Sequence, residues 1–118
     1  MKLDISTIGY YKVITIHDSL KVISDLNSLK SEIEKTLEQG EKLIAVNFSD
    51  ASYLYSGAIS VLITCYRMVR EEGGDLCIIE PQAKIMELLI QMNIDRLIDI
   101  YESEDQLLSK KPDNNNQA

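Results

Sequence analysis

The chain has 118 residues, of which 19 are acidic and 12 are basic, and its formal net charge is -7 at pH 7. A chain of this length forms one domain with its own core, and 45% hydrophobic and 26% charged residues are typical of a globular protein. The negative charge argues against nucleic acid and anionic membranes as partners, because both would repel it. No stretch approaches the roughly 18 consecutive apolar residues of a spanning helix, and residues 1–7 lack the apolar core of a secretory signal, so we expect a cytoplasmic protein.

The residue types that carry catalysis or bind metals are scarce. Cys65 and Cys77 lie in apolar runs without metal-like spacing, which predicts buried, reduced thiols. His17 is the sole histidine and ends a predicted strand, so we interpret it as a partly exposed structural residue. The sequence has no phosphate loop, dinucleotide fingerprint or nucleophile elbow. We therefore expect no enzymatic activity, no cofactor and no metal.

The first third of the chain predicts a hairpin and a helix. Residues 2–6 and 11–17 have the composition of strands, and Gly9 separates them, so they are expected to pair. Ser24 then precedes a helical pattern that ends at Gly40. The apolar positions of this helix recur three and four residues apart; they are Leu26, Leu29, Ile33 and Leu37.

The middle of the chain predicts a helix between two buried strands. Residues 43–48 and 76–79 are short apolar runs without alternation, as in parallel strands that are covered on both faces. The helix between them ends at Gly73 and Gly74. Its apolar stripe comprises Ile59, Leu62, Ile63, Tyr66 and Val69.

The last third predicts two more helices and one more strand. A helix follows Pro81 and is capped by Asn93; its apolar residues are Ile85, Leu88, Leu89 and Met92. Residues 97–101 are expected to form a short strand. Ser103 then has the features of an N-cap for a brief helix with acidic residues in its first turn.

Alternating strands and helices of these lengths predict an α/β fold. We expect a single small mixed sheet, mostly parallel, of four to five strands with an initial antiparallel hairpin. The domain is predicted to cover residues 1–109. Residues 110–118, with Pro112 and three consecutive asparagines, are predicted to form a disordered polar tail.

The segment of residues 49–60 is the candidate functional loop, because binding sites in such sheets lie beyond the carboxyl ends of the parallel strands. Tyr53 and Tyr55 would offer an adhesive surface there. Ser56 stands at the predicted start of a helix, where unpaired backbone N–H groups could stabilise a phosphate on its hydroxyl. The alternative is that Ser56 caps the helix by accepting a backbone hydrogen bond.

Around this loop the sequence resembles the STAS domain in its stand-alone bacterial form, the anti-sigma factor antagonists. The resemblance extends from Leu3 to Leu108 and implies a sheet with helices packed mainly on one side. It is carried by the order and spacing of residues 46–50, 53–62, 73–76, 85–89, 94–97 and 100–104.

In that family the antagonist binds an anti-sigma factor that is also a serine kinase, and this frees a sigma factor for transcription. Phosphorylation of the second hydroxyl residue in an Asp-Ser-Ser-Gly or Asp-Ser-Thr-Gly motif ends the binding. In an ungapped alignment Tyr55 takes the place of the aspartate, Ser56 of the first serine, Gly57 of the phosphoacceptor and Ala58 of the glycine. One of the four motif residues is kept.

The resemblance therefore implies an anti-sigma factor of the serine kinase type as the partner. Either Ser56 accepts the phosphate after a one-residue shift of the loop, or the protein binds its partner constitutively. The expected partner-binding residues are Tyr53, Tyr55, Ser56, Gly57, Ala58 and Ser60. Two alternatives are a scaffolding role in a larger signalling assembly and the binding of a small ligand or nucleotide in the strand-end crevice. The oligomeric state stays open.

Overall fold

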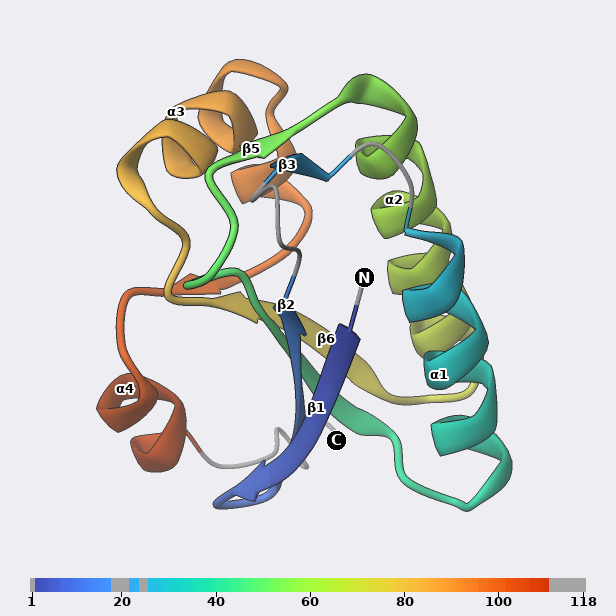
Figure 1. Cartoon of the computed structure of the whole chain (residues 1–118). Helices are drawn as coiled ribbons and strands as arrows, with labels where there is room; N and C mark the ends of the chain where they lie inside the picture. The colour runs from blue at the N-terminus through green and yellow to red at the C-terminus, as the bar shows by residue number, and fades with distance from the viewer. Residues whose placement is uncertain (1, 18–21, 24–25, 111–118) are drawn as a thin grey trace.

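The computed structural model describes residues 2–17, 22–23 and 26–110, and it shows an α/β fold around one five-stranded sheet (Figure 1). The order of the strands is β1-β2-β4-β6-β7. β1 and β2 are antiparallel, and the other neighbouring strands are parallel. The predicted fold class is confirmed. The bounds of the strands are Lys2–Ile8, Tyr11–His17, Leu43–Asn47, Asp75–Ile79 and Ile100–Tyr101.

Three helices cover one face of the sheet and a fourth covers the other face (Figure 1). α1 (Asn27–Glu38), α2 (Ser56–Glu71) and α3 (Ala83–Gln91) pack on the first face, and a short 3₁₀ helix, η1 (Ile94–Arg96), follows α3. α4 (Glu104–Ser109) lies on the second face. This arrangement agrees with the expectation of helices mainly on one side.

The central strands supply both cores because successive side chains of a strand point to opposite faces. Ile14, Val46 and Ile78 belong to the larger core under α1, α2 and α3. Their chain neighbours face the smaller core, into which α4 inserts Leu107. The smaller core comprises Tyr11, Val13, Ala45, Cys77, Ile79 and Leu107. Burial on both faces explains why β4 and β6 are apolar without alternation.

The predicted ends of the helices are largely confirmed. Gly40 and Asn93 follow α1 and α3 with φ of +88° and +61°, the left-handed conformation that ends helices. The Gln106 amide donates to Ser103 Oγ at 3.3 Å, as expected of an N-cap. α1 begins at Asn27 after Leu26, while Ser24 and residues 111–118 of the predicted tail lie outside the described residues.

Two features differ from the sequence prediction. The last strand comprises only Ile100–Tyr101, because the amides of Leu97 and Ile98 donate to the Ile94 carbonyl and so continue the turn that begins with η1. A second, two-stranded parallel sheet pairs β3 (Val22–Ile23) with β5 (Tyr53–Leu54). Strands of two residues show no periodicity, so hydrophobic patterning could not find them.

Candidate partner-binding site

The candidate loop, residues 49–60, comprises the connection from β4 to α2, with β5 in it, and the first residues of α2. Leu54 is buried in the larger core, while Tyr53 is 40% and Tyr55 is 52% exposed. The two tyrosine rings contact each other edge to face, with centroids 5.1 Å apart and an interplanar angle of 75°. The buried leucine thus holds an exposed aromatic pair between β5 and the start of α2.

The surface beside Tyr53 is hollowed towards α3. A groove of about 280 Å³ runs here, lined by Tyr53, Lys84, Glu87, Leu88 and Gln91. A second groove, of about 480 Å³, lies between α1 and α2 and is lined by Leu37, Met68 and four glutamates. The glutamates, Glu34, Glu38, Glu71 and Glu72, would repel a nucleotide phosphate.

The first five residues of α2 expose three of the predicted binding residues: Ser56, Gly57 and Ser60. Tyr55 is the N-cap, and its carbonyl accepts hydrogen bonds from the amides of Ala58 (3.0 Å) and Ile59 (3.1 Å). Ser56 is the first helical residue, and no side chain caps this helix. The interpretation of Ser56 as a side-chain cap is therefore wrong.

Ala58 does not belong to the exposed surface. Its side chain is fully buried and joins the inward stripe of α2 with Leu62, Cys65 and Val69. Residues at this spacing share one face of a helix, and here that face packs on the sheet. The expectation that Ala58 contacts a partner is corrected: its side chain belongs to the core.

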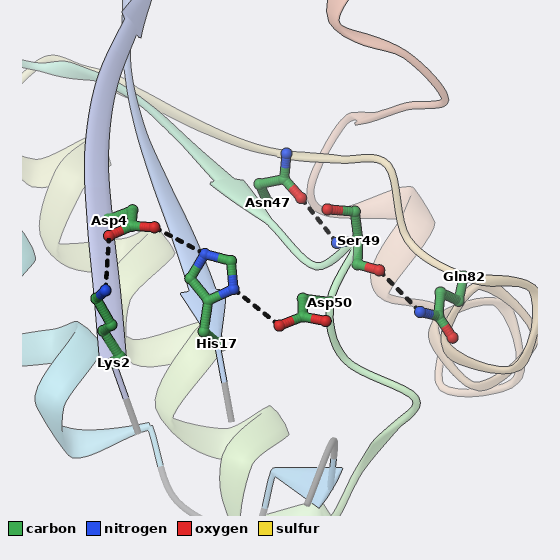
Figure 2. Close-up of polar contacts among 7 residues, drawn as sticks. All are labelled: Lys2, Asp4, His17, Asn47, Ser49, Asp50 and Gln82. Atoms are coloured by element: carbon green, nitrogen blue, oxygen red, sulfur yellow. Dashed lines mark hydrogen bonds and ion pairs between the residues drawn. The ribbon is translucent and has the colours of Figure 1, made fainter. Parts of the chain in front are cut away.

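Two polar side chains, those of Asn47 and Gln82, hold the start of the loop through Ser49 (Figure 2). Asn47, which is 3% exposed, accepts a hydrogen bond from the Ser49 amide at 2.7 Å and donates to Glu80 Oε1 at 3.1 Å. Gln82 Nε2 donates to the Ser49 carbonyl at 2.7 Å. Glu80 has a left-handed backbone with φ of +55°, which few non-glycine residues adopt and which its surroundings must stabilise.

His17 also contacts the loop (Figure 2). Its Nδ1 lies 2.8 Å from Asp50 Oδ2 and its Nε2 lies 2.9 Å from Asp4 Oδ2. The imidazole is 35% exposed, which confirms the prediction of a partly exposed residue. The sequence interpretation missed its contact with Asp50. The available signal was that His17 ends β2 and that Asp50 follows the carboxyl end of β4, the neighbouring parallel strand.

The two cysteines are buried, as predicted. Burial raises the pKa of the Cys65 thiol to about 11 and also raises the pKa of Cys77. Across residues 2–17, 22–23 and 26–110, no group of three or more His, Cys, Asp or Glu side chains could hold a metal ion. No helix in this part of the chain is long and apolar enough to span a membrane.

Residues 7–107 match the STAS domain family, so the chain belongs to this family. A Thermotoga maritima protein, named as a candidate anti-sigma factor antagonist, is 24% identical over 70 residues. The alignment spans 59% of this chain and 62% of that protein, less than two thirds of its length.

Solved structures of anti-sigma factor antagonists have the same fold as this chain. Their sequence identities to it are so low that the likeness shows the fold and nothing more. The solution structure of the Thermotoga maritima protein TM1081 has a TM-score of 0.78 at 17% identity and covers 93% of this chain and 88% of its own. A Mycobacterium paratuberculosis anti-sigma factor antagonist has a TM-score of 0.73 at 14% identity, with coverages of 92% and 91%. Phosphorylated SpoIIAA of Bacillus has a TM-score of 0.65 at 13% identity, with coverages of 90% and 96%.

Proposed function

We propose that this protein is a regulatory binding module without catalytic activity that binds an anti-sigma factor of the serine kinase type. In this partner-switching role it would control transcription from the cytoplasm. The observation that carries the proposal is the exposed pair Tyr53 and Tyr55, which a buried Leu54 holds beside the start of α2. This pair lies where the family motif is expected. The structural neighbours named as antagonists support the same role.

The proposed contact surface combines aromatic area with exposed backbone. It consists of Tyr53, Tyr55, Ser56, Gly57 and Ser60. Tyrosines contribute large contact areas and often dominate binding energy when a partner buries them. Because Leu54 and the polar contacts at Ser49 fix the loop, little conformational entropy should be lost on binding.

Binding is tested with the purified protein and the serine-kinase anti-sigma factors of its source organism, measured by calorimetry. Truncating an aromatic anchor costs about 2 kcal/mol or more at an interface, so the double variant of Tyr53→Ala and Tyr55→Ala should bind at least about tenfold more weakly. Tyr10→Ala is the matched control, because Tyr10 is 57% exposed but lies in the turn between β1 and β2. Absence of binding to every such anti-sigma factor would contradict the proposal.

The sequence of the loop bears on how binding would end. Gly57 carries no hydroxyl, and Tyr55 cannot supply the carboxylate that the family places before the serines. Ser56 is exposed at the first position of α2, where backbone N–H groups could bind a phosphate. We nevertheless expect Ser56 to be phosphorylated poorly or not at all, which would make binding constitutive.

Incubation with the anti-sigma kinase and ATP, followed by mass spectrometry, tests this expectation. Gly57→Ser restores a hydroxyl at the motif position on an exposed helical residue, and it should gain a phosphate that the natural chain lacks. Ser56→Ala is the control that assigns any residual phosphate. Stoichiometric phosphate on Ser56 of the natural chain would show that the switch is retained.

A further inference from the structure

His17 lies between two carboxylates that come from different parts of the chain (Figure 2). Asp4 belongs to β1, and Asp50 belongs to the loop that follows β4. The ring nitrogens approach them at 2.9 Å and 2.8 Å. A neutral imidazole has one N–H and one lone pair, whereas an imidazolium has two N–H groups. Only the protonated ring can therefore donate to both carboxylates at once.

The contact with Asp50 fixes the backbone just before β5. Beyond Asp50 the loop is held by the pairing of β3 with β5, in which Val22 aligns with Tyr53 and Ile23 with Leu54. Before it, Ser49 is held by Asn47 and Gln82. Loss of the His17 contact would leave the segment between Ser49 and Tyr53 with one fewer tie to the sheet.

We propose that His17 is a positioning residue for the loop of residues 49–60, and that its protonation ties this loop to β1. A charged ring can donate to both carboxylates, whereas a neutral ring can donate to only one of them. The proposal concerns the loop itself, and its importance for partner binding rests on the proposed function.

The charges around His17 support its role as a positioning residue. The described side chains that face the ring are the carboxylates Asp4 on β1 and Asp50 on the loop. Lys2 Nζ lies 4.0 Å from Asp4 and shares that carboxylate, so β1 keeps a cation near Asp4 when His17 is neutral. Deprotonation would leave one ring lone pair facing a carboxylate oxygen, which is a repulsive arrangement.

The experiment is an NMR titration of the full chain alone, from about pH 5.5 to 8.5, the range in which histidine changes charge. His17 is the sole histidine, so every imidazole signal belongs to it. The backbone amides of residues 50–54 should shift with the same midpoint as the ring. Loop amides that do not follow the ring would overturn the proposal.

Three variants separate a charge-dependent tie from a merely structural role. His17→Gln should abolish the titration of the loop amides, and His17→Arg should hold them at their low-pH positions throughout, because guanidinium stays charged. Asp50→Asn should abolish the loop response while the His17 ring still titrates, which keeps the test valid if His17→Gln does not fold.

Lys2→Gln is the matched control and should leave the shared midpoint in place. An unchanged loop titration in His17→Gln would overturn the proposal. The titration contains no partner, so a negative result in it would not contradict the proposed partner binding. Conversely, absence of partner binding would not contradict the role of His17 in the loop.

Discussion

β4 and the loop of residues 49–60 are neighbours in the chain, but different forces hold them. Ile44, Ala45 and Val46 of β4 are fully buried between two cores, so burial of apolar surface fixes them. The loop buries Ala51 and Leu54. At its start the Ser49 amide donates to the Asn47 side chain, the Ser49 carbonyl accepts from the Gln82 side chain, and His17 contacts Asp50. A fold held in this way lets exposed loop residues change without cost to the core. This explains how a STAS domain can carry an exposed tyrosine at position 55 and a glycine at position 57 without loss of the fold.

The largest expected effect comes from Ala58→Arg, which would bury an unpaired charge under α2. Because Ala58 is fully buried, we expect loss of the cooperative folded state, checked by circular dichroism and thermal unfolding. Ser60→Arg is the matched control, since Ser60 is exposed two residues further along α2. This control should change the free energy of unfolding by about 0.5 kcal/mol or less. A stable Ala58→Arg protein would show that Ala58 does not belong to the buried face of α2.

A smaller but substantial loss is expected for Phe48→Ala at the boundary between β4 and the loop. Phe48 is fully buried in the larger core, and truncating such a ring typically costs about 3–5 kcal/mol. Urea denaturation measures the change. Tyr55→Ala, which removes a 52% exposed ring, should stay within about 0.5 kcal/mol in the same assay. Similar losses of stability in Phe48→Ala and Tyr55→Ala would show that the strand and the loop are not held by different forces.

Asn47→Ala should have an intermediate effect, because it removes the polar link between β4 and the loop. The Ser49 amide and Glu80 would each lose a partner, which costs about 1–3 kcal/mol for a buried group. Hydrogen exchange should show faster exchange at Ser49 and its neighbours than in β4. Uniform acceleration over both segments would indicate that the loop and the strand unfold as one unit.

The smallest effect is a loss of stability at high pH that originates in the core. The pKa of Cys65 is about 11 in the folded chain against an ordinary value of 9.0, and burial also raises the pKa of Tyr11. The unfolded chain therefore releases these protons first, so the stability is complete below about pH 9 and declines towards pH 11. Urea denaturation at several pH values checks this. Cys65→Ala should decline less steeply, and an equal slope would exclude the thiol as a cause.

Most of the fold was predictable from the sequence, because long elements carry repeated signals. The buried positions Ile59, Leu62 and Val69 of α2, the apolar runs of β4 and β6, and the left-handed residues Gly40 and Asn93 were visible as patterns, whereas Ala58 and Cys65 were not included in the predicted stripe. The pairing of β3 with β5 was not, because two residues carry no period.

The site was only partly predictable. Sequence position identified Tyr53 and Tyr55 as exposed loop residues. It could not decide that Ala58 faces inward, because the direction depends on where α2 begins. It also could not pair His17 with Asp50, since residues 33 apart meet only through the parallel register of β2 and β4.

The position of α4 on the second face of the sheet has a practical consequence. Leu107 of α4 contributes to the cover over Tyr11, Val13, Ala45 and their neighbours. A chain shortened before Glu104 would therefore expose an apolar strip on the central strands and lose solubility, while a tag attached after Lys110 would leave α4 in place. Any affinity handle for the binding experiments thus belongs at the carboxyl end, beyond this helix.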